Sequence, residues 1–215
     1  MVLNPNALTT LDALKLRLGI DPSDTTNDTE LENYINEVSQ NIQSYIGRNI
    51  KAQDYTNELY QPSDEQDLLL DNFPINTVSA IAFGFINPDG TFEVVRDDNI
   101  TYFIHRKGYS LVRPAGWLIE NNYYYDGFRD GYGRYLSREE FAQYSIRVSY
   151  NAGFTDVPSD LEGLTKDIAA ELYTSVITGS QGLKQYRIAD ISMTWKDNLT
   201  PYQLSILNRY RKVKF

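Results

Sequence analysis

Apolar residues recur at intervals of three and four in four stretches of the chain, and each stretch predicts an amphipathic helix. The clearest stripe runs through Leu31, Ile35, Val38 and Ile42, which fall on one side of a helix of about five turns. Three predicted helices cover about residues 10–18, 28–46 and 159–178. A fourth begins at Thr200 and is expected to include most of residues 207–215. Leu11, Leu14 and Leu18 are expected to face inward from the first of them.

Three of these helices are expected to begin with a capping box, in which a side chain and a backbone amide three residues apart bond reciprocally. The spacing joins Asn27 to Glu30, Ser159 to Glu162 and Thr200 to Gln203. Pro201 then occupies the first turn, where its missing N–H costs nothing. Gly19, Gly47 and Gly179 are suited to end the other helices.

Between the second and third helices the period changes to two, which is typical of strands. Tyr144, Ile146, Val148 and Tyr150 alternate with polar residues and predict a half-buried strand. Hairpins are predicted at residues 78–95 and 101–112, and a β-ribbon at 183–189 and 191–196.

The pattern therefore predicts an α+β fold. A core of about four α-helices is interrupted by an antiparallel β-rich insertion and ends in a C-terminal helix. The expected parts are residues 1–52 and 152–215 for the helical core and 53–151 for the insertion, with a Tyr-rich excursion at about 113–142.

Composition agrees with a folded protein. The chain has 215 residues, of which 41% are hydrophobic, enough to bury a sizeable core. No apolar run approaches the roughly 20 residues of a membrane span, and residues 1–12 lack the basic start and apolar stretch of a signal peptide. A soluble protein that does not contact membranes is expected. The chain has no cysteine, which excludes disulfides and thiol chemistry.

Charge is distributed unevenly along the chain. The formal net charge is −9, and residues 1–40 sum to −5, whereas residues 201–215 sum to +4. A basic end of this kind either meets an anionic partner or complements the dipole of the last helix. The sequence leaves both interpretations open.

The stretch from Glu120 to Glu140 fits neither period and is rich in tyrosine and glycine, which predicts a long loop. Tyrosine is favoured at protein interfaces because it offers a large rigid surface with a polar tip. The loop is interpreted as an ordinary surface loop, a tail- or partner-contact loop, or a surface that stacks on sugars or bases. Its candidate contact residues are Tyr123, Tyr124, Tyr125, Phe128, Tyr132 and Tyr135.

Candidate catalytic residues are sparse, and no enzyme is predicted. The single histidine, His105, has no second imidazole for a metal site and stands beside Arg106 and Lys107. The sequence has no Gly-rich phosphate loop and no nucleophile elbow. Neither a metal nor a cofactor is expected.

Five segments in order resemble those of tailed-phage head-to-tail connector proteins, also called adaptor or head-completion proteins. They are LTTLDALKLRLGID, DTELENYINEVSQNIQSYIGRNI, LLLDNFPINTVSAIAF, IRVSYNAGFTDVPSDLEGLTKDIAAELY and LTPYQLSILNRYRK. The resemblance covers most of the chain except about 113–142, where this sequence is longer than compact members of the family.

The resemblance implies a structural adaptor of a phage virion that forms a ring, usually twelvefold, beneath the portal. Such a ring extends the DNA channel, which packaged DNA crosses without specific binding, and presents a surface to the tail or stopper protein. The expected location is the virion neck after assembly in the host cytoplasm. The helices at 28–46 and 159–178 could then supply ring interfaces or simply the chain's own core.

The family also implies that the C-terminal segment docks on the portal. Carried onto this chain, the docking residues are Leu204, Leu207, Arg209, Tyr210, Arg211, Lys212, Lys214 and Phe215. Contact of these bases with phosphate in the channel is the rival interpretation. A glycan- or protein-binding module that uses the Tyr-rich loop is the alternative function.

Overall fold

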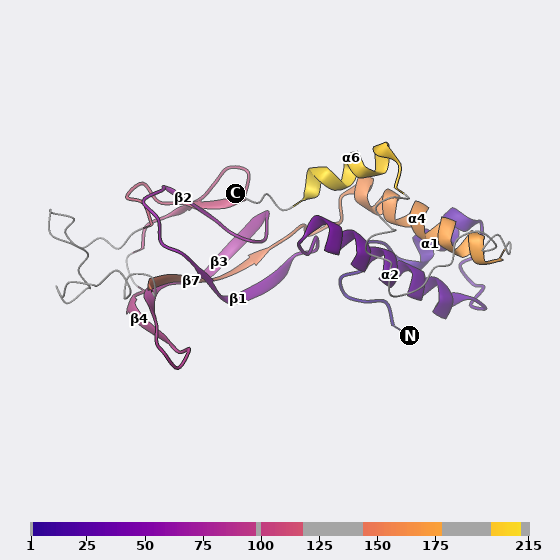
Figure 1. Cartoon of the computed structure of the whole chain (residues 1–215). Coiled ribbons are helices and arrows are strands. Elements are labelled where there is room, and N and C mark those ends of the chain that lie inside the picture. The colour runs from indigo at the N-terminus through magenta and orange to yellow at the C-terminus, as the bar shows by residue number, and fades with distance from the viewer. Residues whose placement is uncertain (1, 98–99, 118–143, 178–198, 212–215) are drawn as a thin grey trace. The chain divides into compact units, whose positions relative to one another are not determined.

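The chain divides into two compact units, which are coloured by residue number in Figure 1. The computed structural model describes residues 2–97, 100–117, 144–177 and 199–211. Unit 1 consists of Met1–Lys51 and Phe154–Phe215, and unit 2 of Ala52–Gly153. The insertion expected at 53–151 differs from unit 2 by at most two residues at either end.

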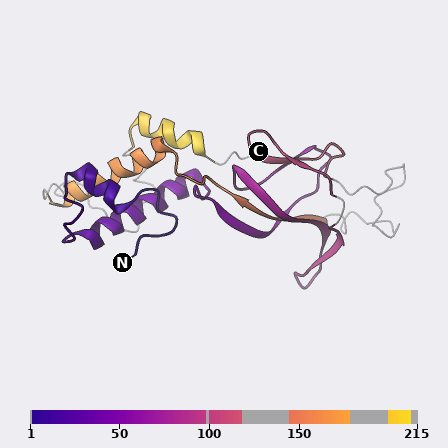
Figure 2. The same cartoon turned by 180° about the vertical axis from the view of Figure 1, so that it is seen from behind.

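Unit 1 is helical in the described residues. Its helices are α1 (Leu11–Leu18), α2 (Asp28–Ile46), α4 (Ser159–Ile177) and α6 (Pro201–Tyr210). Helix α2 packs against α1, α4 and α6, and α6 also contacts α4 (Figures 1 and 2). Their apolar stripes meet in one core, to which each helix contributes. The stripe of α2 therefore lies inside its own unit.

The predicted inward face of α1 is confirmed. Leu14 is fully buried, and Leu11 and Leu18 pack half-buried against the same core. The helix ends as expected at Gly19, and α2 ends at Gly47, whose φ of 80° is in the left-handed region. Glycine takes that conformation without the steric cost of a Cβ atom.

Two of the three predicted capping boxes are wrong. Asn27 is the N-cap of α2, but its side chain accepts no capping bond, and its Nδ2 donates to the hydroxyl of Tyr173 at 3.0 Å. The amide of Glu162 donates to the carbonyl of Pro158, and the Glu162 carboxylate pairs with Lys166. The carbonyl of Pro158 thus takes the amide that local spacing had assigned to Ser159, and the Asn27 side chain bonds to a residue distant in the sequence.

The described residues of unit 2 form two antiparallel sheets. Strands β1 (Gln53–Tyr60), β7 (Tyr144–Ala152), β3 (Ile75–Ile86) and β4 (Phe92–Arg96) form one sheet in that order, and β2 (Asp67–Leu69), β6 (Ser110–Val112) and β5 (Phe103–Ile104) form the other. The hairpins predicted at 78–95 and 101–112 are confirmed as β3–β4 and β5–β6. The chain is thus an α+β protein.

The two sheets of unit 2 share a second hydrophobic core. The predicted inward residues of β7, namely Ile146, Val148 and Tyr150, are buried there together with Leu111 and Trp117. Tyr144 lies in the strand, but its side chain is outside the described residues. The alternation of β7 therefore sets which face of the sheet turns inward.

Strands β1 and β2 escape prediction from the sequence. Strand β1 reads QDYTNELY, and a register shift between Tyr55 and Glu58, with Asn57 at a φ of 57°, breaks its alternation. Strand β2 has three residues, too few to show a period. The ribbon predicted at 183–196 lies outside the described residues.

Candidate functional site

The C-terminal helix α6 carries most of the predicted docking residues that the structure describes. Its start is confirmed: Thr200 accepts a bond from the amide of Gln203 at 3.3 Å, and the Gln203 side chain accepts one from the amide of Thr200 at 2.8 Å. Pro201 occupies the first turn. The helix is therefore defined locally before any packing is considered.

The apolar face of α6 is turned into unit 1. Leu207 is 0% exposed and Ile206 is 3% exposed, both within the core of the unit, and Leu204 is half-buried. Leu207 thus fixes the helix to its own chain, which leaves it no free surface for a partner. The spacing of residues 204, 207 and 210 did not indicate that Ile206 also packs in this core. Ile206 stands next to Leu207 and widens the apolar stripe of α6.

The last turn of α6 is attached to α4 through Asp160. The hydroxyl of Tyr210 donates to Oδ1 of Asp160 at 2.6 Å, and Arg209 donates to Oδ2 at 3.2 Å. The Tyr210 ring stands edge-on to Phe154, with centroids 5.9 Å apart. One carboxylate thus receives both a phenol and a guanidinium from the helix end.

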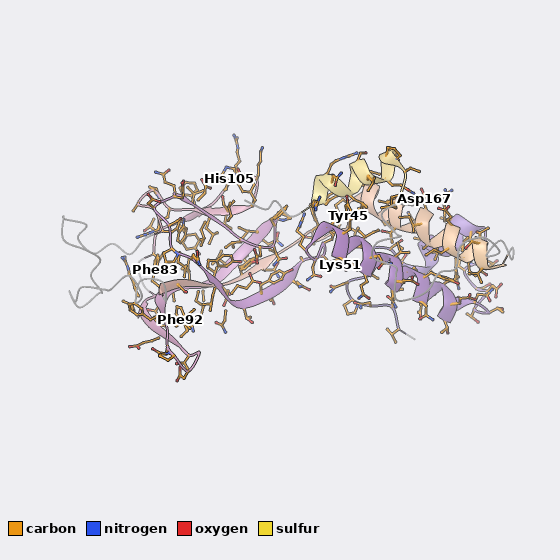
Figure 3. All side chains as sticks on the ribbon, viewed as in Figure 1. Tyr45, Lys51, Phe83, Phe92, His105 and Asp167 are labelled. Atoms are coloured by element: carbon orange, nitrogen blue, oxygen red, sulfur yellow. The ribbon has the colours of Figure 1, made fainter. Side chains whose placement is uncertain are left out.

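The same turn is attached to α2 and the residues that follow it. Nε of Arg48 donates to the carbonyl of Tyr210 at 2.9 Å, and the hydroxyl of Tyr45 donates to Oδ1 of Asn208 at 3.1 Å. The guanidinium of Arg211 lies 5.7 Å from the centre of the Tyr45 ring. Figure 3 labels Tyr45 on α2 close to α6. We call this set of contacts with α2 and α4 the α6 anchor.

The α6 anchor accounts for two of the basic residues near the C-terminus, Arg209 and Arg211. Arg209 and Arg211 have partners in their own unit, so they stabilise the seat of the helix. At Arg211 the backbone leaves the helix, with φ −62° and ψ 139°. The remaining predicted docking residues, Lys212, Lys214 and Phe215, lie beyond this point and outside the described residues. Their role stays a prediction.

Tyr210 gives the α6 anchor a pH dependence. Burial, the hydrogen bond to Asp160 and the nearby negative charge raise the pKa of Tyr210 to about 12. Because the folded pKa lies above the unfolded value of about 10, the anchor is fully present below pH 10 and is lost as the pH rises toward 12.

We expect Tyr210→Phe to lower the free energy of unfolding by about 1 kcal/mol at pH 7, because one charge-assisted hydrogen bond is lost. Urea unfolding from pH 7 to 11.5 should show that the difference between the two proteins shrinks above pH 10. A difference that stays constant across this range would contradict the coupling of Tyr210 to Asp160. Ser205→Ala on the exposed face of α6 is the control, and it should leave both quantities unchanged.

The Tyr-rich stretch lies outside the described residues, so its six candidate contact residues stay predictions. The last described residue before residues 118–143 is fixed: Trp117 is 0% exposed, and its indole N–H donates to the carbonyl of Gln66 at 2.8 Å. The chain re-enters the described fold at Tyr144 in β7. Both ends of the stretch therefore connect to the sheets of unit 2.

The main cluster of titratable groups in unit 2 is built around Glu58. The hydroxyls of Tyr60 and Tyr150 donate to the same oxygen, Oε2, at 2.5 and 2.6 Å. Burial and these bonds raise the pKa of both phenols far above 10. Since phenols that stay protonated are neither bases nor nucleophiles at physiological pH, the cluster acts as a structural network that ties β1 to β7.

His105 stabilises the turn between β5 and β6. Its Nδ1 accepts the amide of Lys107 at 3.1 Å, and its ring lies against Tyr109 with centroids 4.3 Å apart. Among the described residues no three acidic, histidine or cysteine side chains gather as a metal site. No described helix is long and apolar enough to cross a membrane.

Residues 7–109 match the family model described as Head completion protein, which spans α1, α2 and the strands from β1 to β5. The resemblance to head completion proteins is confirmed. The prediction of a structural protein rather than an enzyme is confirmed by the same match. No curated protein matches the chain.

Solved structures extend the likeness in fold over the whole chain. A chain from the virion of a native gene transfer agent (GTA) particle is 12% identical with a TM-score of 0.57, and the match covers 100% of this chain and 95% of that one. A chain from the neck of an empty GTA particle, computed with C6 symmetry, is also 12% identical, with a TM-score of 0.56 and coverages of 100% and 94%.

A chain from the neck of a native GTA particle, computed with C12 symmetry, is 14% identical with a TM-score of 0.54, and the match covers 100% of this chain and 97% of that one. At such low identity these likenesses concern the fold. This likeness in fold includes α4 and α6, which lie beyond the residues that the family model matches.

Proposed function

We propose that this head completion protein is an adaptor of a phage-like virion that forms a twelvefold ring beneath the portal. The ring extends the DNA channel and presents the attachment surface for the tail or stopper protein. The family match and the neck structures of similar fold, computed with C6 and C12 symmetry, support this proposal. A ring requires head-to-tail interfaces between neighbouring copies. The apolar stripes of the helices are buried in the core of unit 1, so the proposed interfaces use other surfaces.

The α6 anchor is the observation that carries the portal end of the proposal. It holds the last turn of α6 on α2 and α4, so the helix ends at a fixed point, and the backbone departs from helical geometry at Arg211. Lys212, Val213, Lys214 and Phe215 follow directly. A fixed root limits the conformational entropy that a short docking segment loses when it binds.

The docking segment is proposed to contact the portal rather than DNA. Val213 and Phe215 alternate with the two lysines, so the segment combines apolar and cationic groups as protein interfaces do. A phosphate contact would use the charges alone and would weaken steeply with salt. The net charge of −9 also favours a channel that DNA crosses without being held.

The tail-facing surface is proposed to include the Tyr-rich stretch, with Tyr123, Tyr124, Tyr125, Phe128, Tyr132 and Tyr135 as contacts. The fixed position of Trp117 at its start supports this assignment, because a buried indole holds the root of the stretch in unit 2. Assembly of the ring on the portal is proposed to take place in the host cytoplasm, and the final location is the virion neck.

The test is co-assembly with the cognate portal, read by electron microscopy. We expect the full chain to form a ring on the portal. A variant whose last four residues, KVKF, are replaced by SGSG should bind at least about tenfold more weakly, since two charges and two apolar side chains are lost. Truncation at Asn208 would be less clear, because it also removes the contacts of Tyr210 with Asp160 and Arg48.

Two controls accompany this experiment. The SGSG variant should keep the melting temperature of the full chain, because the α6 anchor ends at Arg211. Glu37→Lys, on the exposed side of α2, changes the charge without touching the segment. Equal portal binding by the full chain and the SGSG variant would overturn the docking role, whereas failure of the full chain to bind would overturn the adaptor proposal.

A further inference from the structure

The outer face of the β2–β6–β5 sheet in unit 2 exposes two large apolar side chains beside a polar pair, in which the hydroxyl of Ser110 donates to Asp67 at 2.6 Å. Phe103 is 55% exposed and Leu69 is 37% exposed. Val112 pairs with Phe103 on one side and with Asp67 on the other, and paired residues lie on the same face of a sheet. Leu69 is two residues from Asp67 in β2, so it also lies on this face. The opposite face, with Leu68 and Leu111, is buried in the core. The exposed face therefore has room for a partner.

A basic turn stands at the end of the same sheet. Arg106 and Lys107 are exposed between β5 and β6, and among the described residues neither forms an ion pair. They place two positive charges in the turn that follows β5, the strand that contains Phe103. We call Phe103, Arg106 and Lys107 the basic surface.

The turn is held in one conformation. The amide of Gly108 donates to the carbonyl of His105 at 2.7 Å, and the amide of Ile75 donates to the carbonyl of Gly108 at 2.6 Å. Gly108 has a φ of 71°, and a Cβ atom there would lie 3.1 Å from Pro74. Figure 3 labels His105, whose ring accepts the amide of Lys107. The two cations therefore project from a preorganised base.

Unit 1 offers the complementary surface. Leu16 at the end of α1 is 79% exposed, the most exposed leucine among the described residues. Asp12 lies one turn earlier on α1, and Asp21 and Asp24 follow in the next loop, all three exposed and outside every described ion pair. We call Leu16, Asp12, Asp21 and Asp24 the acidic surface. Like the basic surface, the acidic surface combines an exposed apolar side chain with charges outside the described ion pairs, but its charge is negative.

This loop is also fixed. Oδ1 of Asp21 accepts the amide and hydroxyl of Ser23, and Oδ1 of Asp24 accepts those of Thr26. The bonds from Ser23 and Thr26 lower the pKa of the two carboxyl groups. The buried ammonium of Lys15 donates to the carbonyls of Pro22 and Asp24 from inside. Both carboxylates are therefore ionised at neutral pH and exposed, while Lys15 bonds to backbone carbonyls.

We propose that the basic surface of one copy docks on the acidic surface of the next copy. The contact joins two different surfaces of the same chain, so it is heterologous and can close into a ring. It rests on the proposed adaptor function for its biological setting. Opposite charges steer the two surfaces together, and burial of Phe103 and Leu16 stabilises the contact.

The test uses two variants that reverse one surface each. Arg106→Glu/Lys107→Glu makes the basic surface negative. Asp12→Asn/Asp21→Asn/Asp24→Asn/Thr25→Lys changes the acidic surface from −3 to +1, and the asparagine oxygens at 21 and 24 can still accept the bonds from Ser23 and Thr26. Each variant alone should self-associate at least about tenfold more weakly than the parent chain, measured by sedimentation at 50 mM salt. An equimolar mixture should recover association, because each altered surface then faces its complement on the other variant.

Recovery in the mixture also shows that both variants are folded. Glu37→Lys/Glu171→Lys is the matched control, because it changes the net charge of unit 1 at exposed helix positions and should leave association unchanged. The proposal is overturned if each variant associates like the parent, if the mixture does not recover, or if the parent does not associate. It is also overturned if the basic-surface variant loses only binding to duplex DNA.

The portal experiment separates this inference from the proposed function. A ring on the portal that is indifferent to both charge reversals would refute the interface and leave the adaptor proposal intact. Charge-dependent self-association without portal binding would support the interface and refute the adaptor proposal.

Discussion

Lys15→Met is expected to lower the free energy of unfolding by about 3 kcal/mol, a large part of the stability of an ordinary domain. Lys15 is 2% exposed, and its ammonium lies 2.8 Å from the carbonyl of Asp24, 3.2 Å from that of Pro22 and 2.5 Å from Oδ1 of Asp28. The cation thus joins α1, the loop after it and the first turn of α2.

Methionine fills a similar volume but leaves two carbonyls and a carboxylate without their cation. The cost comes from these unsatisfied groups rather than from a cavity. The side chain of Asp28 is 26% exposed, so water can reach it, which places the expected loss at the lower end of the range for broken buried pairs. Asp28→Asn in the same chain should restore part of the loss, because it removes the unpaired charge.

Urea unfolding measures the effect, and Lys166→Met is the matched control. Lys166 also pairs with an acid, Glu162 at 3.3 Å, but both side chains are about 30% exposed, so its replacement should cost no more than about 0.5 kcal/mol. Similar losses for the two lysines would show that burial does not determine the strength of the Lys15 contacts.

Trp117→Ala is expected to destabilise unit 2 by about 3–5 kcal/mol. The indole is 0% exposed, and its ring centre lies 6.4 Å from that of Phe83. The indole N–H of Trp117 donates to the carbonyl of Gln66, and the backbone N–H of Trp117 donates to the carbonyl of Ser63. Alanine leaves a cavity between the sheets and removes the bond that holds residues 63–66.

Hydrogen exchange of individual amides shows where the stability is lost. Units 1 and 2 have separate cores, so the amides of β3 and β7 should exchange faster while those of α2 keep their protection. Phe103→Ala is the control for loss of an aromatic ring, and it should have little effect because Phe103 is more than half exposed. Equal loss of protection in α2 would mean that the two units unfold as one.

Period and turn chemistry are enough to define several elements. The stripe from Leu31 to Ile46 predicts α2 with the bounds it has, and Thr200, Pro201 and Gln203 define the start of α6. The β3–β4 hairpin follows from its Asn-Pro-Asp-Gly turn, where Asp89 accepts the amide of Thr91. These signals are local, because each depends on residues within a few positions of one another.

The sequence by itself therefore determined the α+β class, the helices and hairpins and the head completion resemblance. Tertiary structure alone decided how side chains with several available partners are used. Asn27 bonds to Tyr173 instead of capping α2, Lys15 turns inward, and Arg209 pairs with Asp160. The reason is physical: a helix or turn closes within one segment, whereas a hydrogen bond or ion pair between distant residues forms only after packing has brought them together.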